Sequence, residues 1–319
     1  MPSDSTHTDL KLGLDWLTEN PQIKHITAAV TDLNGVLRGK RLPVTQAKKI
    51  LSGSMRMPPS MLSSDIWGED VEDNQYADLT GDSDGVCQHT GRGFLPVNWT
   101  STPHAFLPLW MTDEEGNPFS GDPRGALASV QNSYAELGLT PVVATELEFY
   151  LYSLEDGKPV APFALNKQRQ FNTAGLLSID EMDQMEELFN EIYAASEAQG
   201  ISADTAISEG GAGQYEINLN HIADPLTAAD NTVLFKRIIK GVARKFGYGA
   251  TFMAKPYGDR AGSSMHVHFS VIDQEGNNIF DNGSEEGSDK LKHAVAGLLA
   301  ALPQLTLIFA PHYNSYRRF

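Results

Sequence analysis

Three segments of the chain alternate apolar and polar residues with a period of two, which is the pattern of strands that bury one face of a sheet. The first, 145–152, places Glu146 and Glu148 opposite an apolar face. The second, 213–220, places Glu216 opposite an apolar face in the same way. Both segments therefore predict strands with one apolar face and acidic residues on the opposite face.

The third segment, 251–272, ends in a strand-like run with imidazoles in place of acids. His266, His268 and Ser270 share one face. The other face is apolar, with Met265, Val267, Phe269 and Val271. Together the three segments predict one sheet with a charged concave face. Because carboxylates cannot be buried side by side without neutralising cations, we expect this face to bind divalent metal.

The remaining pattern predicts an N-terminal region rich in strands, followed by strands that alternate with long helices. Strands are expected at 23–31, 36–43 and 105–111, with a tight turn at Asn34-Gly35. Helices are expected at 10–19, 47–51, 122–137, 178–199, 227–246 and 289–309, the fourth with a Ser178/Glu181 capping box. We place a domain boundary between residues 115 and 116, which gives domains 1–115 and 116–319.

Two stretches are expected to lack regular structure. The hydrophilic stretch 273–288 reads as a hairpin or loop. The stretch 54–76 contains a Pro58-Pro59 pair and is rich in methionine and aromatic residues, so it reads as irregular. Two interpretations of 54–76 stay open at this point, a packed surface loop and a substrate-facing loop.

Composition narrows the class of protein. The chain has 319 residues, of which 41% are hydrophobic, which supports a sizeable core, and its net charge of −17 disfavours binding to nucleic acid or to anionic membranes. Its single cysteine, Cys87, excludes an intramolecular disulfide. No secretory signal is visible, and the apolar run 295–310 is interrupted by Pro303, so we expect it to fall short of a bilayer span. A soluble, cytoplasmic protein is the expectation.

The chemistry depends on the combination of these strands, because a lone Glu-x-Glu or histidine is common on strand faces. Glu146 and Glu148 are spaced to touch either one ion or two neighbouring ions. Glu209 adds an acid in a glycine-rich loop before the second strand. Carboxylates and imidazole with little sulfur suit Mg²⁺ or Mn²⁺, and such ions mostly serve phosphoryl transfer. No phosphate-binding glycine loop of the common kinds is present, so a nucleotide would be bound differently.

The motifs TELEFY, SEGGAGQYEIN, GSSMHVHFS and NSYRR follow one another in the order typical of the glutamine synthetase superfamily. DLNGVLRGKR at 32–41 and GDPR at 121–124 resemble its N-terminal domain and the entry to its catalytic domain. The resemblance covers almost the whole chain. Within the superfamily the chain is most similar to the γ-glutamylpolyamine synthetase branch, which joins glutamate to putrescine or larger polyamines.

The resemblance implies an α+β fold: a small β-grasp-like N-terminal domain, then a catalytic domain with a curved antiparallel sheet and flanking helices. It implies that ATP phosphorylates the γ-carboxylate of glutamate and that an amine then displaces phosphate from the γ-glutamyl phosphate. It also implies a ring-based homo-oligomer such as a dodecamer, in which a neighbour's N-terminal domain completes each active site. No nucleic-acid or membrane partner is expected.

The resemblance also implies a role for each residue of the site. Glu148, Glu209 and Glu216 would bind a first Mg²⁺ or Mn²⁺ ion, and Glu146 and His266 a second ion beside the ATP phosphates. Gly262 would contact glutamate through its backbone. Arg318 would bind a carboxylate, or would be catalytic by stabilising the negative charge of the phosphoryl group during its transfer. His268 and Ser270 would lie near the nucleotide.

Departures from the family pattern guide the choice of amine. The stretch 54–60 lacks the aspartate with which glutamine synthetases bind ammonium, and Ala261 replaces an asparagine. A bulkier amine, contacted by Met55, Met57 or Trp67, fits this loop better than ammonia. The family continues beyond NSYRR, so we expect a truncated form with little or no activity. The alternatives are an ammonia-using glutamine synthetase and a catalytically inactive binding or regulatory homologue.

Overall fold

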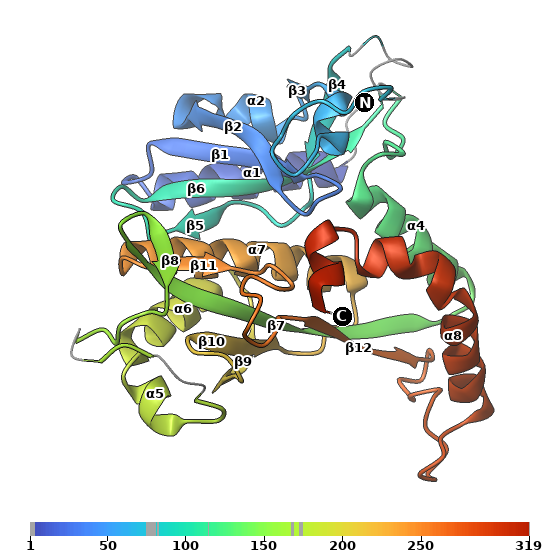
Figure 1. Ribbon diagram of the computed structural model, residues 1–319. Coiled ribbons are helices and arrows are strands. Elements are labelled where there is room, and N and C mark those ends of the chain that lie inside the picture. The colour runs from blue at the N-terminus through green and yellow to red at the C-terminus, as the bar shows by residue number, and fades with distance from the viewer. Residues whose placement is uncertain are drawn as a thin grey trace. The chain divides into compact units, whose positions relative to one another are not determined.

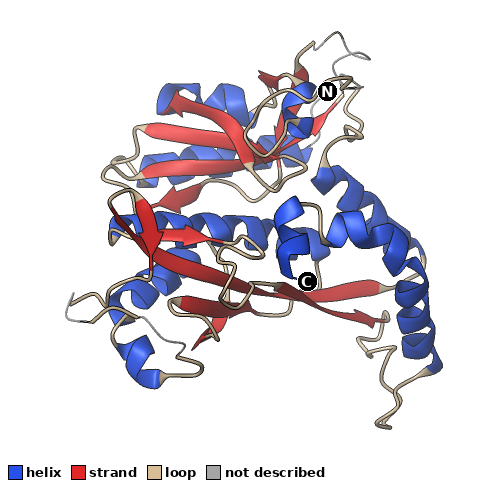
Figure 2. Ribbon diagram, viewed as in Figure 1, coloured by secondary structure: helices blue, strands red, loops and turns tan. Residues whose placement is uncertain are grey.

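The computed structural model describes residues 4–74, 81, 83–113, 115–166, 169–171 and 175–318 (Figure 1; Figure 2). The chain forms two compact units, Met1–Asn132 and Ser133–Phe319, and each is described by itself. This division falls inside a helix, whereas the sequence placed a boundary between residues 115 and 116. That boundary stays a prediction.

The N-terminal unit is built on a mixed sheet with the order β2-β1-β6-β4-β3, and β5 pairs with β6. The β1–β6 pair is parallel and the other pairs are antiparallel. The strands are β1 His25–Thr31, β2 Leu37–Pro43, β3 Met55–Met57, β4 Gly85–His89, β5 Leu95–Val97 and β6 His104–Thr112. Among the described residues, its helices before residue 120 are α1 Asp4–Glu19 and α2 Ala47–Leu51, together with short 3-10 turns. The β-grasp-like assignment of this unit stays a prediction.

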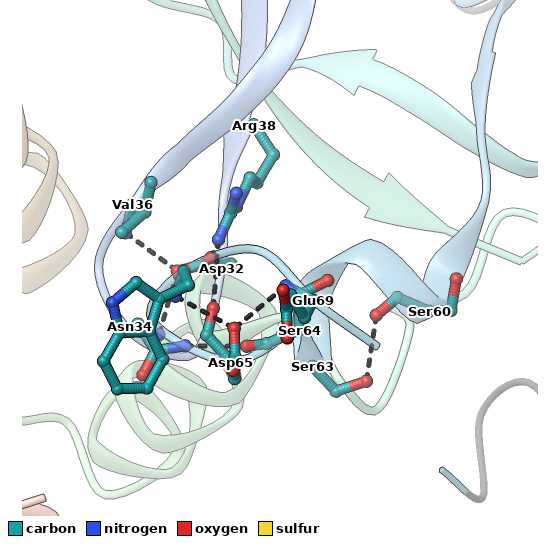
Figure 3. A network of polar contacts seen from close by, with 10 residues as sticks. Asp32, Asn34, Val36, Arg38, Ser60, Ser63, Ser64, Asp65 and Glu69 are labelled. Atoms are coloured by element: carbon teal, nitrogen blue, oxygen red, sulfur yellow. Dashed lines mark hydrogen bonds and ion pairs between the residues drawn. The ribbon is translucent and has the colours of Figure 1, made fainter. Parts of the chain in front are cut away.

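The turn between β1 and β2 is built around a buried carboxylate (Figure 3). Gly35 has a φ of 70°, the conformation that the Asn-Gly pair was expected to supply. Asp32 is 1% exposed; it accepts hydrogen bonds from the backbone N–H groups of Asn34 (2.9 Å) and Val36 (2.8 Å) and pairs with Arg38 at 2.8 Å. Because its acceptor oxygens are satisfied in this way, the charge tolerates burial and fixes the turn.

The same network braces the segment that follows β3. Arg38 donates to the carbonyl of Asp65 (3.2 Å), and the Asn34 amide donates to the carbonyl of Ser64 (2.8 Å). The Asp65 carboxylate accepts from the backbone N–H groups of Trp67 and Glu69, both at 2.9 Å (Figure 3). The exposed Trp67 side chain therefore projects from a turn with a defined backbone.

Part of the expectation for 54–76 is wrong. The segment contains the strand β3 and the 3-10 helix η2 Pro59–Ser63, so it is not irregular throughout, and residues 75–76 lie outside the described residues. Met55 and Met57 are 6% and 2% exposed and belong to the core of the N-terminal unit. Neither side chain is available to an amine, whereas Trp67 is 84% exposed.

The C-terminal unit is built on an antiparallel sheet with the order β11-β7-β10-β9, and β12 and β8 also pair with β7. Its strands are β7 Thr140–Glu155, β8 Lys158–Val160, β9 Ala203–Ser208, β10 Gln214–Leu219, β11 Gly249–Thr251 and β12 Met265–Ile272. With 16 residues, β7 is long enough to pair with four other strands, so every strand that carries a predicted site residue lies on it or beside it. The predicted antiparallel catalytic sheet is confirmed.

The helices are α4 Pro123–Glu136, α5 Ile179–Asp183, α6 Glu186–Ala198, α7 Pro225–Lys245 and α8 Asp289–Phe309. Asp122 caps α4, and the Ser178 side chain accepts from the backbone N–H of Glu181, as the capping patterns predicted. The single helix expected over 178–199 is wrong, because the chain breaks at Gln184-Met185 and forms α5 and α6. α7 packs on β7 and β11 and against α6.

The apolar faces of β7 and β10 are buried as predicted, with Leu147, Phe149, Leu151, Tyr215, Ile217 and Leu219 between 0% and 6% exposed. The expected burial of the apolar face of β12 is only partly confirmed. Val271 is buried, but Met265, Val267 and Phe269 are 47–54% exposed. No described residue of α8 is buried either.

By length and composition, α8 could cross a membrane, so the expectation that this run falls short of a bilayer span is wrong in that respect. One helix of this kind is weak evidence for a membrane protein. Helices in the core of soluble proteins can meet the same criteria of length and composition.

Candidate metal and substrate site

Strand register brings the predicted acids and imidazole together on β7, β10 and β12. Glu146 on β7 lies opposite His266 of β12 on one side and Asn218 of β10 on the other. Glu148 lies opposite Glu216 of β10. Directly opposed side chains on neighbouring strands are close enough to share one ligand.

Glu146 is the centre of a hydrogen-bonded group. Its Oε2 lies 3.0 Å from His266 Nδ1, its Oε1 lies 2.8 Å from His268 Nε2, and the Asn218 amide donates to Oε1 at 3.4 Å. Burial works to raise the pKa of Glu146, but the hydrogen bonds and charge of the two histidines outweigh it and hold the pKa below its usual range. Glu146 is therefore an ionised acceptor in this structure.

Glu148 is linked to the glycine-serine loop before β12. It accepts hydrogen bonds from the Ser264 hydroxyl and from the Gln214 amide, the latter at 3.1 Å. The same amide nitrogen donates to the carbonyl of Gly262 at 3.0 Å. Gln214 thus couples the position of a predicted metal ligand to the position of the predicted glutamate loop.

Glu216 is 8% exposed and completes the acidic cluster. Ligand atoms of Glu146, Glu216 and His266 lie within 4.8 Å of one another. Burial, and then the charges of Glu146, Glu209 and Glu148, raise the pKa of Glu216 to about 7. The shift therefore reflects the burial of this carboxylate first and the neighbouring negative charges second.

These residues fit a divalent cation. The group offers carboxylate and imidazole ligands of the kind that Mg²⁺ and Mn²⁺ accept. Two further oxygens on β10, Gln214 Oε1 and Asn218 Oδ1, are buried and have no hydrogen-bond partner among the described residues. Unsatisfied buried oxygens beside clustered carboxylates are acceptors that an ion or its water ligands would use. The family resemblance implied that Glu216 and Glu146 bind different ions, and that division stays a prediction.

Glu209 lies at the turn between β9 and β10, where the backbone is tightly constrained. Its N–H donates to the carbonyl of Gln214 (2.8 Å), and the Gln214 N–H donates to the carbonyl of Gly211 (2.8 Å). A Cβ on Gly211 would overlap the hydroxyl of Tyr150. Only glycine fits there, which explains part of the Gly-Gly-Ala-Gly run.

The structure also brings Gly262 and Arg318 together. Arg318 donates to the carbonyl of Ser263 at 3.3 Å, and a Cβ on Gly262 would lie 2.9 Å from Arg318 Nε. Asn314 anchors the same C-terminal turn, since its side chain accepts from the Lys255 N–H (2.7 Å) and donates to the Lys255 carbonyl (2.9 Å). The two residues predicted to bind substrate are neighbours.

The two residues predicted to lie near a nucleotide share the polar face of β12. His268 contacts Glu146 and stacks edge-on against His221, with ring centroids 5.8 Å apart. Ser270 lies two residues further from the acidic cluster. A nucleotide role for either residue stays a prediction.

Three supporting residues were not among the predicted site residues. Gln214 bridges Glu148 to the glycine loop, and Asn218 contacts Glu146. Both lie two residues from Glu216 along β10, so strand alternation places them on the same face as Glu216. Tyr150 donates to the carbonyl of Ala261 at 2.8 Å, and no local pattern signals this contact between residues 111 positions apart.

Comparison with known proteins places this geometry in a family. The family model for the glutamine synthetase catalytic domain matches residues 120–319. The chain is 36% identical over 314 residues to γ-glutamylputrescine synthetase PuuA of Escherichia coli (strain K12), covering 95% of this chain and 65% of that protein. It is 29% identical over 321 residues to a glutamine synthetase of Halobacterium salinarum, covering 99% of this chain and 66% of that protein.

Solved structures agree. The fold superimposes on a structure described as a GmaS/ADP complex with a TM-score of 0.80 and 25% sequence identity, covering 95% of this chain and 66% of that chain. The chain spans slightly less than two thirds of the length of these relatives.

Proposed function

Since the chain belongs to the glutamine synthetase family, we propose that it forms part of an ATP-dependent ligase that joins the γ-carboxylate of glutamate to an amine. ATP would phosphorylate the γ-carboxylate, and the amine nitrogen would then attack the γ-glutamyl phosphate, forming the amide and releasing phosphate. In this reaction the transferred phosphoryl group and the attacking amine must be brought together in one charged site.

The observation that carries this proposal is the group formed by Glu146, Glu216 and His266 on three adjacent strands. With Glu148 and Glu209 it would hold two or more Mg²⁺ or Mn²⁺ ions. Such ions would supply charge neutralisation for the ATP phosphates and the γ-carboxylate. The protein's part would be to align these carboxylates, and the strand register around β7 supports that role.

The glycine loop and the C-terminal turn would position glutamate and the transferred charge. Gly262 would present its backbone to glutamate, because only a residue without Cβ lets a ligand approach so closely beside Arg318. The Arg318 guanidinium keeps several donors beyond its bond to Ser263 and would bind a carboxylate or the transferring phosphoryl group. His268 and Ser270 would line the nucleotide side of the cluster.

The proposed amine is putrescine or a larger polyamine. Support comes from the 36% identity to a protein named γ-glutamylputrescine synthetase and from the absence of an aspartate in 54–60. An apolar alkyl chain would find a contact surface in the exposed Trp67, whose backbone is braced by Asp65. Ammonia remains the alternative amine, supported by the 29% identity to a glutamine synthetase.

An assay of phosphate release separates these choices. The full-length product of the gene, with ATP, Mg²⁺ and glutamate, is expected to release phosphate when putrescine or spermine is added and not with ammonium. Preference for ammonium would overturn the polyamine assignment. Failure with every amine, in a protein that still binds ATP and metal, would support the inactive homologue.

We further propose a cytoplasmic, ring-shaped homo-oligomer in which the N-terminal unit of one copy completes the site of the next. Light scattering coupled to size-exclusion chromatography of the full-length protein tests this. A monomer with full activity would contradict it.

A further inference from the structure

A cavity of about 560 Å³ lies in the C-terminal unit between the end of α7, the start of β11 and the far end of β7. Lys240 and Arg244 of α7, Tyr152 of β7 and Tyr248 and Gly249 line it. Its lining shares no residue with the acidic cluster. None of the described lining residues is acidic, although the chain as a whole carries a net charge of −17.

The shape of the cavity follows from how α7 ends. Gly247 has a φ of 83°; its N–H donates to the Arg244 carbonyl (3.1 Å), and the Tyr248 N–H donates to the Ala243 carbonyl (2.9 Å). This glycine-terminated motif reverses the chain and satisfies two of the terminal carbonyls of the helix. These two carbonyls are therefore not free acceptors for a cation at this end of the helix.

The cations of the cavity belong to a stripe along one side of α7. Lys236, Lys240 and Arg244 are spaced four residues apart, so they lie on the same helix face, where like charges repel. Lys236 and Lys240 both place their ammonium groups near the Phe252 ring, at 5.5 and 5.7 Å from its centroid. No ion pair of these three side chains with a carboxylate occurs in the part of the chain that the structure describes.

The pKa shifts of the two lysines agree with a cluster of positive charges that repel one another. Burial lowers the pKa of Lys236, and the charge of Lys240 lowers it further. Burial lowers the pKa of Lys240 too, with a further contribution from Arg244. A bound anion would relieve this repulsion.

We propose that this cavity, formed by Lys240, Arg244 and the Tyr152 wall, is a binding site for a small phosphorylated molecule, separate from the acidic cluster. The exposed Arg244 guanidinium offers paired donors that match phosphate oxygens, and Lys240 adds a point charge one helical turn away. The cavity is larger than a phosphate group alone, and the ring of Tyr152, which lies over Gly249, provides an apolar wall for the rest of the ligand. The inference does not depend on the proposed ligase reaction.

The test is calorimetric titration of the 319-residue chain with inorganic pyrophosphate, in EDTA and at low salt. EDTA removes metal-dependent phosphate binding at the acidic cluster. Saturable binding with one site per chain is expected, and the Lys240→Met/Arg244→Met variant should bind roughly tenfold or more weakly, since it loses charge-assisted hydrogen bonds. Arg244→Met alone, at an exposed position, gives the same readout if the double variant does not fold.

A matched control removes two positive charges elsewhere. Lys48→Met/Lys49→Met, on exposed positions of α2, should bind pyrophosphate like the unchanged chain. Glu216→Gln should also leave pyrophosphate binding unchanged, which separates this site from the proposed metal site. Equal weakening by the control pair, no saturable binding, or unaltered binding by the α7 variants would overturn the proposal. Citrate titrated in parallel is expected to bind more weakly, and tighter binding of citrate would overturn the phosphate assignment.

Discussion

At the scale of single residues, Glu216 is the most informative position of the acidic cluster. It is the most enclosed of the acids at the site, and its carboxylate is close to ligand atoms of both Glu146 and His266. Replacing it with glutamine keeps its shape and removes one negative charge. Glu216→Gln should therefore weaken Mn²⁺ binding by roughly tenfold or more, since a charged ligand is lost.

Calorimetric titration of the 319-residue chain with Mn²⁺ measures this effect. Glu155→Gln, at the exposed end of the same strand system, is the matched control and should leave Mn²⁺ affinity unchanged. Unaltered Mn²⁺ affinity in Glu216→Gln would remove this residue from the site.

The raised pKa of Glu216 should make the binding of Mn²⁺ depend on pH. Its value of about 7 is raised from the ordinary range, mainly by burial and then by neighbouring carboxylates. An ion must displace the proton that Glu216 retains below this pH, so apparent Mn²⁺ affinity should fall by up to about tenfold per pH unit below 7 and level off above it.

The same raised pKa has the opposite sign for stability without metal. Glu216 favours the folded state most at pH values below its unfolded pKa, and this contribution is lost as pH rises through about 7. Metal titrations between pH 6 and pH 8 test the first effect, and thermal unfolding in EDTA tests the second. In Glu216→Gln both pH dependences should shrink; a profile that does not change would assign them to other groups.

At the scale of elements, the turn between β9 and β10 controls where Glu209 and Glu216 sit. A methyl group on Gly211 would overlap the Tyr150 hydroxyl, which itself donates to the Ala261 carbonyl of the glycine loop. We expect Gly211→Ala to lower the free energy of unfolding by about 1–3 kcal/mol, the usual cost of overpacking, and to weaken Mn²⁺ binding.

Gly210→Ala is the control for this turn. A Cβ there meets only Ala261 at 3.8 Å, which is ordinary contact. The free energy of unfolding, measured by urea denaturation, should therefore be close to that of the unchanged chain for Gly210→Ala and clearly lower for Gly211→Ala. Equal destabilisation of the two variants would mean that glycine is needed for backbone conformation and not for space.

The site was predictable from sequence to the extent that strand alternation determines it. On β7 and β10, one face is buried in the core, so the opposite face had to carry Glu146, Glu148 and Glu216. The contacts of Gln214 and Tyr150 were not predictable, because they depend on which distant loop packs above the strand.

The fold shows the same limit. The short strands β3, β4 and β5, of three to five residues, were missed because they are defined by long-range pairing and not by a local pattern. The break between α5 and α6 has no glycine or proline to announce it; Met185 is fully buried there. Met55 and Met57 were predicted to contact an amine from a loop. In the structure both side chains lie on the buried face of the strand β3.

At the scale of the whole molecule, two helices of 21 residues differ in how much of them is covered. α7 buries eleven residues against its neighbours, and α8 buries none among those described. Since helices in proteins owe most of their stability to packing, α8 should be the least protected long helix of the 319-residue chain. In a dilute, monomeric sample, the backbone amide hydrogens of α8 should exchange with solvent much faster than those of α7. Protection of α8 that rises with protein concentration would show that another copy covers its apolar side chains, whereas equal protection of both helices in the monomer would contradict the prediction.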